Sequence, residues 1–291
     1  MATECVERVA GHQVDAVWAL STGRSSLAWV AQVGEERWVA RVPVKDSGRR
    51  ITYQAEVAIG RYLNSLGHPV ADWTIVNNDG TMCSVAREVP GVPADYNRAW
   101  SDDFGRQLAG VLADLHAMPA EGFGPLADDQ QSIRGLSDDR VHGIVDRWCH
   151  ARVWPFDDSS LDDHPIVELA PEIANAVSTL AGDIEAADTG STGVVHSDLH
   201  REHLLIGRDG SLTGVLDFGD AFIGSIAWDF ALLNWYYGKA NAAVVARHHP
   251  AGSDALDQGV TLSVAVGLYK VAKNPNDPAM IPRLRNCLES A

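Results

Sequence analysis

Short apolar runs separated by turn residues fill the first part of the chain. Three runs lie between residues 14 and 44, and two more, 70–76 and 81–89, flank the turn sequence Asn77-Asn78-Asp79-Gly80. Such spacing is typical of antiparallel strands joined by hairpins. From Ile51 to Leu66, between the third and fourth runs, apolar residues recur every three or four positions, which predicts a helix. The first part of the chain is therefore predicted to be strand-rich with one helix.

The spacing changes to that of helices in the second part of the chain. Helices are predicted at residues 102–118, 165–187 and 260–273, with a further helix or helix pair at 141–156. Short apolar runs at Val194-Val195, Leu204-Leu205-Ile206 and residues 213–216 predict strands among these helices. The stretch from Pro275 to Ala291 is expected to be peripheral.

Composition narrows the class of protein. The chain has 291 residues, of which 46% are hydrophobic and 21% charged, as in a soluble globular protein with a large core. It contains no apolar run of about 18 residues and no signal-like N-terminus, so we expect a cytoplasmic protein outside membranes. The four cysteines (Cys5, Cys83, Cys149 and Cys287) are far apart, which indicates free thiols. The net charge of −16 disfavours nucleic acid as a partner.

Polar residues gather at two neighbouring strand ends in the second part of the chain. Asp198 and His203 lie just before the run Leu204-Leu205-Ile206, and Asp217 follows the next run. The turn sequence Arg208-Asp209-Gly210-Ser211 separates the two runs and predicts a hairpin. A hairpin would bring the two carboxylates and the imidazole together. One carboxylate could then accept the proton of an attacking hydroxyl while the other groups bind Mg²⁺, as phosphoryl transfer requires.

Two other interpretations of these residues are open. An isolated Asp-Phe-Gly sequence is common by chance, and a single histidine beside an apolar strand is usually structural. His196, His200 and His203 could also form a metalloenzyme site, because their spacing suits one face of a helix. The flanking apolar runs instead indicate strand, loop and strand, in which the three side chains would not share a face.

The stretch from His196 to His203, together with Asp217-Phe218-Gly219, resembles the catalytic loop and metal-binding segment of the kinase-like antibiotic phosphotransferases. In most of that family the residue five positions after the catalytic Asp is Asn; here it is His203, as in the macrolide phosphotransferases. The resemblance implies that Asp198 is the general base or orients the hydroxyl, and that His203 and Asp217 bind Mg²⁺. It extends over roughly residues 17–233 and implies a bilobal, kinase-like α+β fold: residues 1–88 form the nucleotide-binding lobe, and residues 89–291 form a larger, mainly helical lobe.

The same resemblance implies a nucleotide site between the lobes. The loop with Ser25 and Ser26 would cover the phosphates through its backbone N–H groups. Arg41 stands where kinases have a phosphate-binding Lys, and Glu56 in the predicted helix would be its acidic partner. The base would bind the hinge backbone, which consists of Arg87, Glu88 and Val89.

Two conserved-looking features of the resemblance are expected to be structural rather than chemical: Asp229 would tether the catalytic loop by hydrogen bonds, and His116 would lie in the core. Residues Asp220, Trp235 and Tyr236 are candidates for the acceptor pocket, since aromatic groups could floor a site for a large apolar ligand.

The substrate implied by His203 and by Arg41-Val42-Pro43 is a macrolide, phosphorylated at the 2′-hydroxyl of its amino sugar with GTP, or ATP, as donor. An aminoglycoside phosphotransferase is the alternative, and the acidic residues Asp157, Asp158, Asp162 and Asp163 could serve its polycationic substrate. A small-metabolite kinase, a protein kinase and a binding module without turnover also remain open. We expect a monomer.

Overall fold

The computed structural model describes the chain except for residues 23–25, 45–51, 130, 141–153 and 157–159. Ser25, Cys149 and most of the helix predicted at residues 141–156 therefore lie outside the described residues, as do Asp157 and Asp158. Nothing in the described part is a helix both long enough and apolar enough to cross a membrane.

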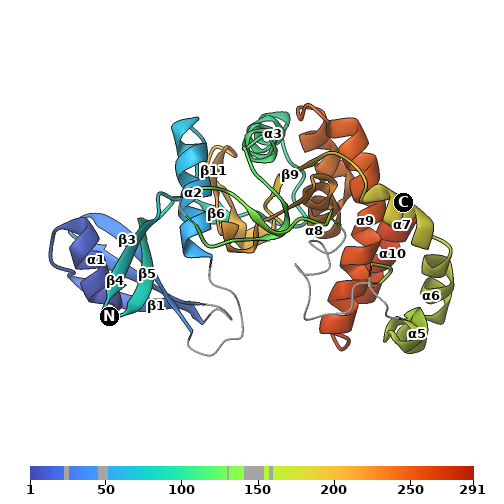
Figure 1. Cartoon of the computed structure of the whole chain (residues 1–291), viewed down its shortest axis with the longest axis horizontal. Helices are drawn as coiled ribbons and strands as arrows, with labels where there is room; N and C mark the ends of the chain where they lie inside the picture. Colours follow the sequence, from blue (N-terminus) through green and yellow to red (C-terminus); the bar gives the residue numbers. More distant parts are fainter. Residues whose placement is uncertain (23–25, 45–51, 130, 141–153, 157–159) are drawn as a thin grey trace.

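A five-stranded antiparallel sheet forms the first part of the chain (Figure 1). Its strands are β1 (Ala16–Thr22), β2 (Ser26–Val33), β3 (Glu36–Pro43), β4 (Thr74–Asn78) and β5 (Thr81–Arg87), in the order β1-β2-β3-β5-β4. All five predicted strands are confirmed, although β4 begins four residues later than predicted. The predicted helix is also confirmed as α2 (Tyr53–Ser65).

Helices cover both faces of this sheet. Cys5 and Val6 of α1 (Ala2–Ala10) are fully buried against one face, beside Trp38 and Val85. Val57 of α2 is buried on the opposite face. The sequence did not predict α1, because a helix of nine residues is marginal by itself and forms here against the sheet.

Two small sheets follow in the second part of the chain. In one, β6 (Val92–Pro93) pairs with β10 (Leu204–Ile206), which pairs in turn with β11 (Leu212–Val215). The other has the order β8-β7-β12-β9 and contains β7 (Phe123–Leu126), β8 (Gly135–Ser137), β9 (Thr192–Val195) and β12 (Phe222–Ser225). The strand β5 of the large sheet ends at Arg87, and β6 pairs with a strand of the second part. The lobe boundary after residue 88 stays a prediction.

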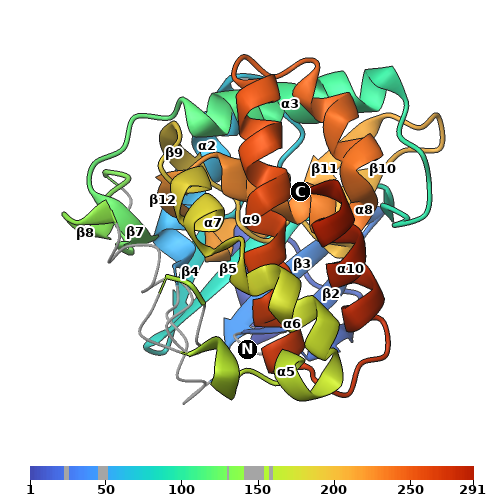
Figure 2. The same cartoon turned by 90° about the vertical axis from the view of Figure 1, so that its right-hand side faces the viewer.

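Helices make up most of the second part (Figure 2). The long ones are α3 (Asp102–His116), α8 (Ala227–Ala246), α9 (Gly252–Lys273) and α10 (Met280–Ser290). The single helix predicted at residues 165–187 is wrong. The chain forms three short helices there: α5 (Ile166–Leu169), α6 (Pro171–Ser178) and α7 (Ala181–Ala187). Pro171 begins a new helix because it lacks an N–H to donate backwards, and Ala170 before it has a non-helical φ of −157°.

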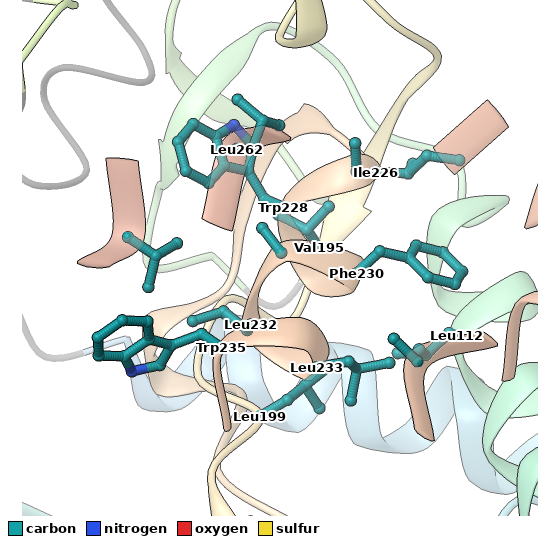
Figure 3. Packing of buried hydrophobic residues seen from close by; sticks show 14 of the residues in the cluster. Leu112, Val195, Leu199, Ile226, Trp228, Phe230, Leu232, Leu233, Trp235 and Leu262 are labelled. Carbon is teal, nitrogen blue, oxygen red and sulfur yellow. The ribbon is translucent and has the colours of Figure 1, made fainter. Parts of the chain in front are cut away.

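The main core lies around the first half of α8. Trp228, Phe230 and Leu233 are almost fully buried, and Figure 3 shows their side chains leaving the helix in different directions. Gly259 of α9 packs against Phe230, where a Cβ would come within 2.6 Å of its side chain, so the two helices lie close together. The result is a mixed α+β fold with an antiparallel sheet at one end and a larger helical region at the other, as predicted.

Candidate active site

The hairpin of β10 and β11 brings the predicted site residues together. His203 ends the turn η2 (Arg201–His203) directly before β10, and its carbonyl accepts a hydrogen bond from Leu216 N at 2.9 Å. This bond places Asp217 opposite His203, so that His203 Nε2 lies 3.5 Å from Asp217 Oδ2. His203 Nδ1 lies 3.7 Å from Asp198 Oδ2 on the other side. The predicted convergence of two carboxylates and an imidazole is confirmed.

Hydrogen bonding determines which nitrogen of His203 can bind a metal. His203 Nδ1 lies 2.7 Å from the backbone carbonyl of Asp198, which can only accept, so Nδ1 carries the proton. The lone pair of the neutral ring is then on Nε2, the nitrogen that faces Asp217. A backbone carbonyl that fixes the tautomer is the usual support for a metal-binding histidine. An imidazole nitrogen and a carboxylate that is about half exposed therefore form a suitable pair of ligands for a divalent cation.

Asp198 is fixed within the loop but remains accessible. Its N–H donates to His196 Nδ1 at 3.2 Å, and about a quarter of its side chain is exposed. Burial alone would raise the pKa of Asp198, but the electrostatic interactions with His203, His200 and Lys270 outweigh burial and hold the pKa below its ordinary value. The carboxylate is thus ionised and able to accept a hydrogen bond from a hydroxyl group.

The three-histidine metal site considered above is wrong. His196 is fully buried, its Nδ1 accepts from Asp198 N, and its Nε2 donates to the carbonyl of Leu216 at 2.9 Å. Both ring nitrogens are therefore occupied. A different group meets the geometric requirement for a cation: one ligand atom each from Asp198, His200 and His203 lie within 4.8 Å of one another. His200 was not among the predicted site residues.

The loop that carries Asp198 is held in place by Asp229, which lies in the first turn of α8. Its carboxylate is fully buried and accepts from His196 N at 2.9 Å, from Ser197 N at 2.8 Å and from the ring of His116 at 3.0 Å. His116 also contacts His249 at 3.1 Å. The tethering role of Asp229 and the structural role of His116 are confirmed.

Backbone strain is concentrated at this site. Ser197 and Asp217 have φ angles of 62° and 63°, in the left-handed region that residues other than Gly rarely adopt. Among the described residues, only Asp79, in the turn between β4 and β5, shares this property. Strain of this kind persists where surrounding contacts over-determine the backbone, and the bonds from Asp229 supply such contacts at Ser197.

Arg41 connects the sheet to this loop. It forms a buried ion pair with Glu56 of α2, as predicted, and its Nη1 lies 3.5 Å from Asp217 Oδ1. Its guanidinium lies 3.9 Å from the ring centroid of Trp73. Burial disfavours the charge of Arg41, but Glu56 and Asp217 outweigh that penalty, so the pKa of Arg41 lies above its ordinary value. A permanent positive charge is thus held beside Asp217.

The predicted hinge residues lie at the end of β5. Arg87 and Glu88 form ion pairs with Glu36 at 3.0 Å and Arg37 at 2.9 Å, respectively. Val89 packs with Val39 and Leu216 against the apolar cluster under the sheet. A cavity of about 490 Å³ also adjoins Arg87, Glu88 and Val89, but it lies towards the end of α2 and away from Asp217. Ser26, the first residue of β2, is partly exposed.

The predicted acceptor residues have different environments. Tyr236 is partly exposed, and its ring centroid lies 6.2 Å from that of His200. Asp220 is partly exposed in the turn η3 (Phe218–Asp220), and its carbonyl accepts from Ser197 Oγ. Trp235 is only 3% exposed and lies within the core (Figure 3), so its ring cannot floor a pocket in this structure.

Residues 17–258 match the family described as the phosphotransferase enzyme family, APH. The chain belongs to this family. One relative by sequence is the uncharacterised protein YcbJ of Bacillus subtilis (strain 168). The two are 23% identical over 222 residues, which cover 73% of this chain and 67% of YcbJ.

Solved structures of antibiotic phosphotransferases share the fold of this phosphotransferase. A thermostable mutant of aminoglycoside phosphotransferase APH(4)-Ia in its apo form has a TM-score of 0.66 at 18% identity, covering 99% of this chain and 97% of the other. The macrolide 2′-phosphotransferase MphH from Brachybacterium faecium has a TM-score of 0.57 at 17% identity, covering 99% and 98%. Both likenesses establish the kinase-like fold.

Two polar residues beside the candidate site were not among the residues predicted for phosphoryl transfer. The ring of His200 lies against that of His203, with centroids 3.8 Å apart and an interplanar angle of 37°, and the charge of Lys270 of α9 helps to lower the pKa of Asp198. A signal for His200 was present, because it lies two residues after Asp198. No signal pointed to Lys270, which is more than seventy positions away along the chain.

Proposed function

We propose that this phosphotransferase transfers the γ-phosphate of a purine nucleotide to a hydroxyl group of a small molecule. The observation that carries the proposal is the meeting of Asp198, His203 and Asp217 around one hairpin, with Asp217 in contact with Arg41. This arrangement offers a base, a metal-binding pair and a phosphate-binding cation in one row. A binding module without turnover would not need all of them.

Each residue has a role that follows from its contacts. Asp198 accepts a hydrogen bond from the acceptor hydroxyl and orients its oxygen, which suffices because the transition state of phosphoryl transfer is loose. Arg41, fixed by Glu56, binds the phosphates of the nucleotide. The purine ring of the nucleotide packs near Val39, Val89 and Leu216, beside the backbone of Arg87 and Glu88. The loop with Ser26 covers the phosphates.

A divalent cation, Mg²⁺, would be held by His203 Nε2 and Asp217, where it would neutralise charge on the phosphates. The tautomer of His203 supports this assignment, because its lone pair faces Asp217. An imidazole is a softer ligand than the amide oxygen usual at this position of the family, so the metal preference is expected to differ.

In its finer form the proposal names the 2′-hydroxyl of a macrolide amino sugar as acceptor and GTP as preferred donor, with ATP as second donor. The support is His203 and the sequence Arg41-Val42-Pro43, both of which resemble the macrolide phosphotransferases. An aminoglycoside is the second candidate acceptor, on the resemblance of the same catalytic loop. The protein is proposed to act as a monomer, which light scattering of the purified protein tests.

The test measures rates with purified protein for GTP and ATP, each combined with erythromycin-like macrolides and kanamycin-like aminoglycosides, with mass spectrometry of the products. Asp198→Ala should abolish turnover while nucleotide binding persists, and Asp217→Ala should weaken binding of the metal-nucleotide complex. Asp183→Ala, an exposed carboxylate on α7, is the control and should retain the wild-type rate. Wild-type turnover in Asp198→Ala would refute the assignment of the base.

A further inference from the structure

Three tyrosines form an aromatic surface beside Asp198, which we call the tyrosine shelf: Tyr96, Tyr236 and Tyr269. Tyr96 and Tyr236 stack with ring centroids 5.7 Å apart and an interplanar angle of 12°. Tyr236 in turn meets the edge of His200, whose Nε2 lies 3.8 Å from Asp198 Oδ2. The shelf therefore leads directly to the carboxylate that is proposed to receive the acceptor hydroxyl.

Basic side chains lie over this shelf. Lys270 Nζ is 5.3 Å from the ring centroid of Tyr236 and 5.8 Å from that of Tyr269. The guanidinium of Arg283 is 5.1 Å from the ring centroid of Tyr96. These side chains come from α9 and α10, two helices that pack together along one side of the shelf.

A third cation also lies over the shelf: the guanidinium of Arg201 is 5.8 Å from the ring centroid of Tyr96. We call Arg201, Lys270 and Arg283 the basic rim. Lys273 is not counted in the rim, because its Nζ donates to Tyr269 Oη at 3.1 Å. In the part of the chain that the structure describes, none of these three forms an ion pair with a carboxylate, whereas Arg37, Arg41 and Arg87 do.

The overall charge makes this arrangement unusual. The chain has 39 acidic and 23 basic residues, so a surface chosen at random would be acidic. The carboxylates of Asp198 and Glu202 act electrostatically on His200, but neither forms an ion pair with the rim. Cations resting on tyrosine rings are stabilised by the rings while their charge remains available to a ligand.

The basic rim lies on the acceptor side of the site. Arg41 Nη1, proposed to bind the nucleotide phosphates, lies 3.5 Å from Asp217 Oδ1, whereas Lys270 lies over Tyr236, whose ring meets His200 beside Asp198. The positive charge of Lys270 also helps to lower the pKa of Asp198. The two cations thus flank the carboxylates from the sheet and from α9, respectively. Since Arg41 already serves the nucleotide, the rim is available to the acceptor.

We infer that the acceptor of this phosphotransferase carries an oxyanion, a carboxylate or a phosphate, next to a ring that packs on Tyr236. The inference rests on the general form of the proposed function, phosphoryl transfer to a hydroxyl group of a small molecule, and competes with the amino-sugar acceptor of its finer form. Lys270 attracts an oxyanion beside the reacting hydroxyl, whereas the ammonium group of an amino sugar would be repelled there. The two classes of acceptor would therefore place opposite charges beside Lys270: a negative charge for the oxyanion and a positive charge for an amino-sugar antibiotic.

The test uses three probes of similar size and different charge: 3-(hydroxymethyl)benzoate, 3-(hydroxymethyl)benzamide and 3-(aminomethyl)benzyl alcohol. Binding to the full chain with Mg²⁺ and a non-hydrolysable nucleotide is measured by calorimetry. We expect the benzoate to bind about tenfold more tightly than the amide, and the amine to bind most weakly. Lys270→Met should remove this order of affinities. Arg283→Gln is a second variant, which should weaken the same order and serves as the test if Lys270→Met does not fold.

Lys239→Met is the matched control, because Lys239 is exposed on α8 and, among the residues that the structure describes, its one hydrogen bond is to the carbonyl of Ser290. It should leave the order of the three probes unchanged. Equal binding of the probes, or preference for the amine, would overturn the inference. Phosphorylation of an amino-sugar antibiotic that becomes slower in Lys270→Met would do the same while leaving phosphoryl transfer as the function. Failure of the function itself would appear separately, as absence of nucleotide binding and of any phosphorylated product.

Discussion

Replacing Asp229 by Asn tests whether the catalytic loop depends on one buried carboxylate. Three donors converge on its two oxygens: Ser197 N on Oδ1, and His196 N together with His116 on Oδ2. An amide keeps one oxygen and turns an NH₂ group towards the remaining donor. Because the side chain is fully buried, water cannot replace the lost partner.

The magnitude follows from these contacts. A hydrogen bond to a buried charge contributes about 1.5–3 kcal/mol, and leaving a buried donor without a partner costs about 1–3 kcal/mol. Since at least one N–H loses its acceptor and the others lose a charged one, we expect Asp229→Asn to lower the free energy of unfolding by about 3–5 kcal/mol. The loop that carries Asp198 would also shift, and a displacement of about 1 Å reduces turnover by about a hundredfold.

Denaturant unfolding of the wild type and the variant measures the loss of stability, and steady-state rates measure the loss of turnover. Asp183→Asn is the control, because Asp183 occupies the same early position in α7 but is exposed; it should cost no more than about 1 kcal/mol. A loss in Asp229→Asn no larger than in this control would refute the reasoning, since the three bonds would then contribute nothing measurable.

Three further predictions concern groups around the site and in the core. Glu56→Gln removes the closer of the two carboxylates that offset the buried charge of Arg41, so it should lower the free energy of unfolding by about 1–3 kcal/mol and weaken nucleotide binding. The exposed Glu185→Gln is the control, and equal urea midpoints of the two variants would contradict this. His203→Asn replaces an imidazole by an amide oxygen and should lower the ratio of Mn²⁺-supported to Mg²⁺-supported rates; an unchanged ratio would argue against His203 as a ligand. Burial raises the pKa of Asp188 from 3.8 to about 6, so its folded form holds the proton more tightly than the unfolded form, and its contribution to stability falls as pH rises from about 4 to about 6. Asp188→Asn should remove this slope and stabilise the protein at pH 8 by up to about 3 kcal/mol, as urea midpoints at pH 5 and pH 8 would measure; parallel pH profiles would contradict it.

Local patterns in the sequence were sufficient for the strands and the hairpin. Short apolar runs on either side of the turn sequence from Arg208 to Ser211 specify β10 and β11 within a dozen residues, and this hairpin places His203 opposite Asp217. Short apolar runs bounded by turn residues indicate buried strands directly, because both features are local in the chain. The partner of Arg41 was also predicted, from the resemblance to the kinase-like phosphotransferases and from the place of Glu56 in the predicted helix, and the two side chains do pair.

The orientation of residues on α8 was decided by the tertiary structure. Apart from Asp229 and Asn234, which are themselves buried, the first half of this helix is apolar, so its sequence has no exposed polar face that would indicate which side chains point outward. Trp235 and Tyr236 are neighbours in the chain, yet the first lies in the core and the second faces His200. Only the packing of α9 and α10 around α8 distinguishes them.

What the sequence alone determined is the five strands of the first sheet, the helix α2 and the hairpin that carries the candidate site, because these depend on residues close together in the chain. What only the tertiary structure decided is which distant residues surround that site. His116 and Asp229 are separated by 113 positions, and Lys270 reaches Asp198 from α9. Such contacts form when helices pack together and bury apolar surface. Because the hydrophobic effect is non-directional, no local pattern in the sequence indicates which polar side chains the packed helices bring together.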